Sequence, residues 1–174
     1  MNLKKSAPAL KWVCYILFAL LCFCLQIAPV RFGVFSNVLF VLPFVVSVAS
    51  FEEIIPSTVF AVVCGFFCDY SSNRLFGFHA MIFLVLCVSV SLAMKYFVRP
   101  VFLSVIAAIS CSVVVYSLFD FFFFNVLLGY TSLFSLFVSE YLSQILKTIF
   151  WSVGISYIAM KIYKISPVKA KFDS

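Results

Sequence analysis

Residues 61–80 read Ala-Val-Val-Cys-Gly-Phe-Phe-Cys-Asp-Tyr-Ser-Ser-Asn-Arg-Leu-Phe-Gly-Phe-His-Ala, and they are the most informative stretch of the chain. One apolar run ends at Asp69, a short polar loop containing Arg74 follows, and Gly77-Phe-His79-Ala80 opens a second apolar run. This pattern predicts two helices joined by a tight connection. Because only 10% of the residues are charged, a carboxylate at the end of an apolar helix is expected to have a defined partner.

The composition indicates a membrane protein. The chain has 174 residues, of which 66% are hydrophobic and 20% aromatic, and its mean hydropathy is +1.22. A soluble domain with so few charges would expose one continuous apolar surface. We therefore expect residues 1–174 to form a single membrane domain.

Six apolar runs approach the length of about 20 residues that a helix needs to cross a bilayer. Pro43 is expected to bend the second helix. The last two runs exceed the required length, which favours a tilt, a kink or an interfacial extension around Phe121–Val138. The sequence thus predicts an all-α integral membrane protein, a six-transmembrane-helix bundle with spans of about 12–28, 34–51, 54–69, 78–97, 101–121 and 139–160.

The basic residues predict the orientation of this bundle. With six spans both termini lie on one side, which holds nine lysines and arginines, whereas the other side holds only Arg31 and Arg74. Such a bias places both termini in the cytoplasm. We expect the basic ends to meet anionic lipid headgroups, and no nucleic-acid partner is expected. The nine residues are Lys4, Lys5, Lys11, Lys95, Arg99, Lys161, Lys164, Lys169 and Lys171.

Ionisable residues within the apolar runs are expected to gather near the opposite, outer end. Counted at about 1.5 Å per residue, Asp69, Asp120 and Glu140 reach one level, with Lys147 about 10 Å deeper and His79 at a helix start. Two interpretations remain open. These residues form an outward-facing polar pocket or partner-docking surface, or Lys147 pairs with Asp120 or Asp69 between helices.

A second acidic pair, Glu52 and Glu53, falls in the short connection between the second and third spans. Acidic residues at the start of a helix suit its dipole. We interpret this pair as a solvated turn, with Lys95 and Arg99 as possible ion-pair partners.

Sequence motifs of catalysis and cofactor binding are lacking. His79 is the only histidine, and all seven cysteines fall in apolar runs, where they behave as small apolar residues. Cys64 and Cys68 are four apart, but no further ligand follows at the spacing of a metal site. Ser143 lies one turn from Lys147, a pairing that is common by chance. The sequence predicts a protein that is not an enzyme and holds no cofactor or metal.

Around Gly65–Ala80 the chain resembles the MreD family of bacterial rod shape-determining proteins. The family pattern is an apolar helix ending in Gly, a few apolar residues and Asp, then a short loop, then Leu-Gly-Leu-His-Ala and another apolar helix. The matching positions are Gly65, Asp69, Gly77 and His79, and Phe78 stands where the family has leucine. The chain length, the predicted spans and the basic ends also resemble the family.

This resemblance implies a non-catalytic scaffold of the cell-elongation complex in the bacterial cytoplasmic (inner) membrane. It implies direct association with MreC, and association through the complex with the MreB filament, the glycosyltransferase RodA and its partner penicillin-binding transpeptidase. In that role Asp69, Arg74 and His79 would pin the third and fourth helices together or shape the outer face that holds MreC.

A rival interpretation comes from another class of protein. Substrate-binding subunits of energy-coupling-factor vitamin transporters also have about this size, six helices and a Gly-x-x-x-Asp-like element. They usually carry an Ala-x-x-x-Ala pair on the first helix, whereas here Ala19 is followed by Phe23. In that case Asp69, Asp120, Glu140 and Lys147 would be the candidate pocket residues.

Overall fold

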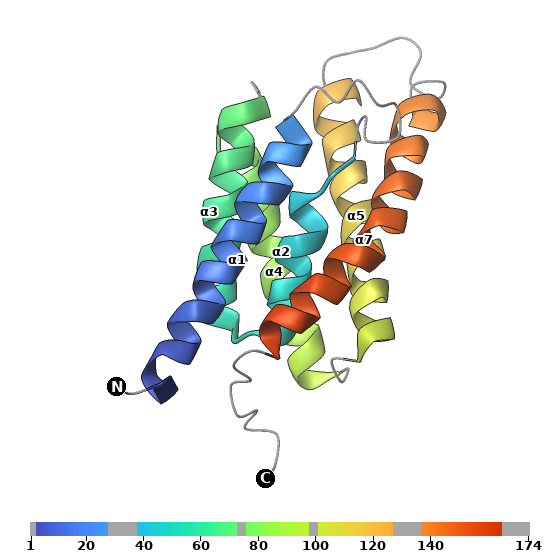
Figure 1. Ribbon diagram of the computed structural model, residues 1–174. Helices are drawn as coiled ribbons and strands as arrows, with labels where there is room; N and C mark the ends of the chain where they lie inside the picture. Colours follow the sequence, from blue (N-terminus) through green and yellow to red (C-terminus); the bar gives the residue numbers. More distant parts are fainter. Residues whose placement is uncertain (1–2, 28–37, 73–75, 98–100, 127–136, 165–174) are drawn as a thin grey trace.

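A computed structural model describes residues 3–27, 38–72, 76–97, 101–126 and 137–164 (Figure 1). Within these ranges the regular secondary structure is entirely helical. Two short π-helices, η1 and η2, continue α5 and precede α7. The elements are α1 (Leu3–Ile27), α2 (Val41–Phe51), α3 (Ile54–Ser72), α4 (Phe78–Tyr96), α5 (Phe102–Phe121), η1 (Phe122–Val126), η2 (Phe137–Tyr141) and α7 (Leu142–Tyr163).

The prediction of six spans is not confirmed, because five of the described helices are long and apolar enough to cross a membrane. These helices give the chain the character of a multi-pass membrane protein. The exception is α2, whose 11 residues cover only about 16 Å of a hydrocarbon core about 30 Å thick. The five candidate spans are Leu10–Ile27, Ile54–Ser72, Phe78–Tyr96, Phe102–Asn125 and Ser139–Tyr163.

The short helix α2 forms the centre of the bundle. Residues Val41 to Ser50 are all buried, and α2 packs against α1, α3, α4, α5 and α7. The hydroxyl groups of Ser47 and Ser50 donate to carbonyl groups of their own helix, so they bring no unsatisfied polar atom into the core. Because α2 is apolar on every face, it can be surrounded by helices on all sides.

The second predicted span also differs in its first half. Residues 34–37 lie outside the described residues, and Val38–Phe40 have no helical structure. Pro43 therefore lies in the first turn of α2, where proline is tolerated because the N–H at that position has no partner within the helix. The expected bend at Pro43 is wrong, since the helix begins there.

The buried backbone before α2 obtains its hydrogen bonds from side chains of two other helices. The side-chain oxygen of Gln26 on α1 accepts from Phe40 N at 3.1 Å and from Val41 N at 3.2 Å. The hydroxyl oxygen of Thr148 on α7 accepts from Leu39 N at 3.2 Å. Non-helical backbone at membrane depth persists only where such groups are satisfied, so these two side chains hold the start of α2 in place.

The chain alternates in direction through the bundle, so that α1 begins and α7 ends at the same end (Figure 1). We call this end, which also contains the connection from α2 to α3, the termini end. The opposite end, where α3 finishes and α4 begins, is called the hairpin end. The π-helices η1 and η2 lie at the hairpin end. The tilt, kink or interfacial extension expected around Phe121–Val138 stays a prediction, because residues 127–136 lie outside the described part.

Candidate functional site

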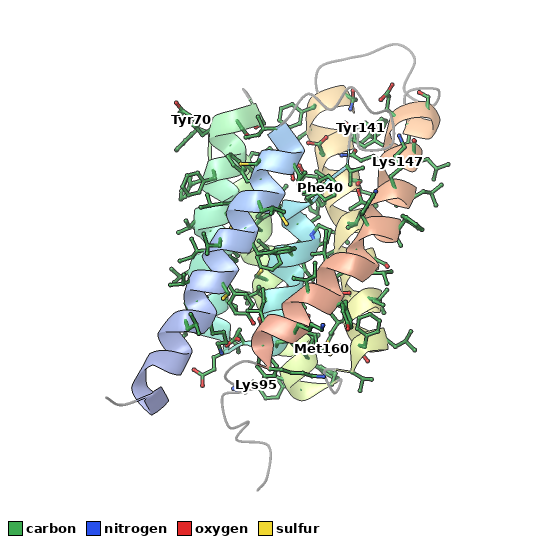
Figure 2. All side chains as sticks on the ribbon, in the orientation of Figure 1. Phe40, Tyr70, Lys95, Tyr141, Lys147 and Met160 are labelled. Atoms are coloured by element: carbon green, nitrogen blue, oxygen red, sulfur yellow. The ribbon has the colours of Figure 1, made fainter. Side chains whose placement is uncertain are left out.

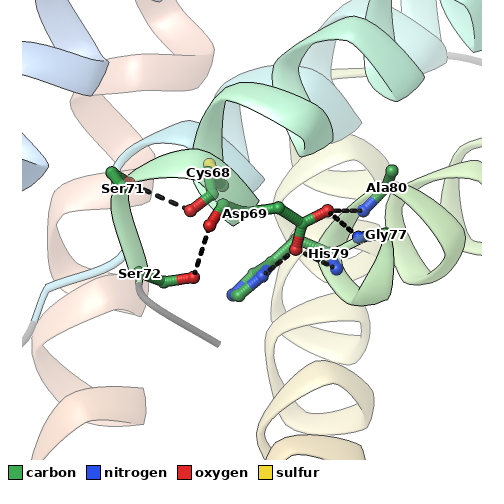
Figure 3. Close-up of polar contacts among 7 residues, drawn as sticks. All are labelled: Cys68, Asp69, Ser71, Ser72, Gly77, His79 and Ala80. Carbon is green, nitrogen blue, oxygen red and sulfur yellow. Dashed lines mark hydrogen bonds and ion pairs between the residues drawn. The ribbon is translucent and has the colours of Figure 1, made fainter. Parts of the chain in front are cut away.

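The carboxylate of Asp69 joins the end of α3 to the start of α4 (Figure 3). Its Oδ2 accepts from Gly77 N at 2.9 Å and from Ala80 N at 3.3 Å. Its Oδ1 accepts from His79 N at 2.9 Å and lies 2.7 Å from His79 Nδ1. The first N–H groups of a helix have no partner within the helix, and here a residue of the preceding helix supplies one.

Asp69 and His79 are both buried, and their contact is an ion pair when the imidazole is protonated. An ionised carboxylate only accepts hydrogen bonds, so Nδ1 of His79 is the donor. The negative charge of Asp69 also lies against the positive end of the α4 dipole. Backbone hydrogen bonds, the helix dipole and the imidazole therefore all stabilise the same buried charge.

Gly77 makes this geometry possible at the start of α4. Its φ is +96°, a left-handed conformation, which costs other L-residues about 1–2 kcal/mol. A Cβ at this position would meet nothing within 4 Å. The requirement for glycine here is therefore conformational rather than steric.

Gly65 allows α3 and α4 to approach closely one turn before Asp69. A Cβ built on Gly65 would overlap the backbone of Ala80 and would lie 2.7 Å from Ala80 N. Small residues at helix contacts allow backbones to approach within a bilayer. Gly65 and Asp69 thus contact the same first turn of α4, one through packing and the other through hydrogen bonds.

Replacing Gly65 by alanine is expected to destabilise the protein by about 1–3 kcal/mol, because two helix backbones would have to separate. Gly154→Ala on α7 is the matched control, since nothing lies within 4 Å of its Cβ position, and relief of the glycine penalty predicts a gain of about 0.5–1 kcal/mol. Denaturation in mixed micelles, followed by circular dichroism, measures both variants. Equal stability of the two variants would contradict a close contact at Gly65.

Aromatic rings connect this joint to α5. The ring of His79 lies 5.9 Å from that of Tyr116, and Phe78 contacts Phe123 and Phe124 with centroid distances of 5.4 and 5.1 Å. The two Phe78 contacts are edge-to-face, and such contacts add about 0.5–1.5 kcal/mol each beyond the area they bury. The α3–α4 joint is therefore fixed against α5 and η1.

A second polar cluster lies at the hairpin end between α5, η1 and η2. The hydroxyl group of Tyr141 donates to Asp120 Oδ2 at 2.9 Å and accepts from Asn125 Nδ2 at 2.8 Å. Asp120 is buried, and the ring of Tyr141 packs against Phe121 and Phe137. Sequence analysis identified Asp120 but missed Tyr141 and Asn125, which follow no motif and are brought together by the two π-helices.

The two clusters contain only some of the predicted site residues. Asp69 pairs with His79, so the expected pairing of Asp69 with Lys147 is wrong; pairing of Lys147 with Asp120 stays a prediction. Glu140 is exposed on η2 and Lys147 is half-buried on α7. Arg74 lies outside the described residues. The structure brings together Gly65, Asp69, Gly77 and His79.

Sequence analysis missed a buried ion pair at the termini end. Nζ of Lys11 lies 2.8 Å from Oε1 of Glu52, and the two side chains are 1% and 3% exposed. The hydroxyl group of Tyr15 donates to Glu52 at 3.0 Å, and Lys11 lies over the ring of Tyr163 at 5.6 Å. Glu52 is therefore not part of a solvated turn and does not pair with Lys95, although Glu53 is exposed.

One sequence signal points to this pair. Lys11 and Tyr15 are four residues apart and share one face of α1, and a lysine on the packed face of an apolar helix calls for an acidic partner. The identity of that partner follows only from the fold, because 41 residues separate Lys11 from Glu52.

Among the residues that the structure describes, no group of three His, Cys, Asp or Glu side chains is arranged to hold a metal ion. Comparison of the chain with protein-family models, with curated proteins and with solved structures gives no match. The function of this chain is therefore inferred from the geometry of these clusters and from the family resemblance of residues 65–80.

Proposed function

We propose that this protein is a non-catalytic membrane scaffold of the MreD type within the bacterial cell-elongation complex. In this role it binds MreC directly and, through the complex, helps to couple the MreB filament to wall synthesis by RodA and its transpeptidase. The observation that carries the proposal is that the motif residues Gly65, Asp69, Gly77 and His79 contact one another where α3 meets α4. Both oxygens of Asp69 are occupied by groups of α4, an arrangement that suits a rigid joint.

The motif supports a structural role at each of its positions. Gly65 permits the close approach of α3 and α4, Gly77 permits the turn, and the Asp69–His79 pair closes the joint. A catalytic or ligand-binding carboxylate would need at least one oxygen directed toward the substrate. A rigid hairpin instead offers a preorganised surface, which lowers the entropic cost of binding a partner.

The proposed location is the bacterial cytoplasmic membrane, with both termini in the cytoplasm. Support comes from the described basic residues, because Lys95, Lys161 and Lys164 lie at the ends of α4 and α7, the end where α1 begins (Figures 1 and 2). Lys11 is paired with Glu52, whereas Lys95, Lys161 and Lys164 are placed to meet anionic headgroups. The hairpin end then faces the periplasm, where MreC would be met.

Exposed aromatic residues at the hairpin end provide a partner surface for this role. Tyr70 on α3 and Phe76 before α4 are 85% and 74% exposed, and Tyr70 projects from the hairpin end in Figure 2. Aromatic residues dominate the binding energy of protein interfaces. At the termini end of α4, Tyr96 and Phe97 are 69% and 89% exposed. These two residues are a matched control for substitution of Tyr70 and Phe76.

The test is affinity purification of the tagged chain from its native bacterium after gentle solubilisation. Recovery of MreC is expected to fall at least about tenfold, which corresponds to about 1.4 kcal/mol, in the double variant Tyr70→Ala/Phe76→Ala. The control Tyr96→Ala/Phe97→Ala should recover MreC normally. Absence of MreC from the purified unaltered chain would contradict the scaffold function. Equal recovery of MreC with the two double variants, at equal abundance, would contradict docking of MreC on Tyr70 and Phe76.

Two observations favour the alternative, a substrate-binding subunit of an energy-coupling-factor transporter. The hydroxyl of Ser117 is buried on α5 and has no hydrogen-bond partner among the described residues, and α2 begins inside the bundle. Interrupted helices form the substrate sites of many transporters. Recovery of a coupling subunit with paired ATPases in the same purification would establish this alternative and exclude the scaffold.

A further inference from the structure

An apolar pocket opens between α1 and α3. Its volume is about 490 Å³, within the range of about 300–1,000 Å³ that is typical of small-molecule sites. Ala19, Val41 and Cys64 form its buried floor, and Ile16 and Val63 belong to its half-exposed rim. The lining also includes Trp12, Leu20, Phe23, Pro56, Val59, Phe60 and Phe67.

The pocket lies between α1 and α3 over the start of the short helix α2. Val41, the first residue of α2, lies at the base of the pocket. The small side chain of Ala19 faces this space from α1, so a larger residue at position 19 would occupy it. The remaining walls are aliphatic and aromatic, and their position within the candidate spans Leu10–Ile27 and Ile54–Ser72 places the opening at hydrocarbon depth.

Two aromatic pairs bridge α1 and α3 along the pocket. Trp12 and Phe60 are 6.1 Å apart between ring centroids, and Phe23 and Phe67 are 5.9 Å apart. Trp12 and Phe23 are 11 residues apart, so the bridges are separated by about 16 Å along α1. A transmembrane helix about 10 Å wide and 30 Å long cannot lie between them.

We propose that this pocket binds one acyl chain of a membrane phospholipid, which enters from the side between α1 and α3. A flexible hydrocarbon chain fits between the two aromatic bridges, and the apolar lining offers no partner to a polar headgroup. Because lipid tails are as apolar as the lining, binding depends on close packing rather than on removal from water. The proposal does not depend on the scaffold function.

Trp12 in the pocket wall provides the measurement. In a Trp151→Phe background Trp12 is the only tryptophan. Purified protein in mild detergent is titrated with a phosphatidylcholine that carries brominated acyl chains, which quench tryptophan fluorescence on contact. Quenching of Trp12 is expected to saturate at one lipid per chain.

Ala19→Phe in the same background should lower the saturable quenching at least about tenfold, because the ring fills the pocket. The matched control Ala107→Phe places the same ring on the exposed surface of α5 and should leave the quenching unchanged. Quenching that rises linearly without saturation, or that is equal in both variants, would overturn the proposal.

A second measurement keeps the test valid if Ala19→Phe does not fold. Phospholipid with a photoreactive acyl chain is cross-linked to the otherwise unaltered chain in native membranes, and the modified peptides are identified. Cross-links are expected to concentrate on Ile16, Leu20 and Val63. Cross-links spread evenly over exposed positions such as Leu103 and Phe150, or a protein segment captured at the pocket, would contradict an acyl-chain site.

Discussion

Replacing Asp69 by alanine is expected to produce the largest loss of stability of any single change in the hairpin. The substitution leaves the buried N–H groups of His79 and Ala80, and the part-buried N–H of Gly77, without their acceptor. Each buried unsatisfied group costs about 1–3 kcal/mol, so the free energy of unfolding should fall by about 3 kcal/mol or more. Denaturation in mixed micelles measures the loss directly, and the amount of folded protein in membranes should fall with it.

The asparagine variant separates hydrogen bonding from charge at the same position. Asp69→Asn keeps one acceptor oxygen for the α4 N–H groups but removes the charge that faces His79 and the helix dipole. Its stability should lie between those of the alanine variant and the unaltered protein. Glu53→Gln is the control, because Glu53 is exposed and its charge should contribute little. If Asp69→Ala were as stable as this control, Asp69 could not be the cap of α4.

A comparable loss is expected at the termini end when the buried ion pair is broken. Lys11→Met leaves the carboxylate of Glu52 buried without its lysine, as Glu52→Met leaves the lysine without its carboxylate. Removing one partner of a buried pair typically costs about 3–5 kcal/mol. Both single variants should therefore unfold at clearly lower denaturant concentration.

The double variant Lys11→Met/Glu52→Met distinguishes pairing from simple loss of packing. An apolar replacement of both members of a buried pair is often neutral or stabilising, so the double variant should recover most of the stability that each single variant loses. This recovery is a coupling energy of the kind that a double-mutant cycle measures. Additive losses in the double variant would show that the two charges do not depend on each other.

These two charged clusters hold the chain at opposite ends of the bundle. The Asp69 joint connects α3 with α4, and the Lys11–Glu52 pair connects α1 with the connection that follows α2. Stacking of Phe51 on Tyr163 at 5.4 Å extends the second cluster to α7. Within a bilayer, polar side chains hold particular pairs of helices together through hydrogen bonds.

The two clusters differ in how easily their residues can be predicted from the sequence. The residues of the Asp69 joint lie within sixteen positions of one another, between Gly65 and Ala80, so a local pattern of Gly, Asp, Gly and His was sufficient to identify them. Lys11 and Glu52 are distant in sequence, and each had a plausible role as a solvated charge near a helix end. Only the packing of α1 against α2 shows that both are buried.

Sequence patterns were sufficient to predict the helical membrane class, the approximate bounds of five long helices and the joining of two helices through residues 65–80. These follow from hydropathy, helix length and local motif spacing, which act over short stretches of chain. The tertiary structure was needed to show that α2 is a short central helix, that Gln26 and Thr148 accept hydrogen bonds from the backbone at its start, and that α1 and α3 enclose a pocket. An apolar run has the same composition whether lipid or other helices surround it, so its surroundings depend on the packing of the whole bundle.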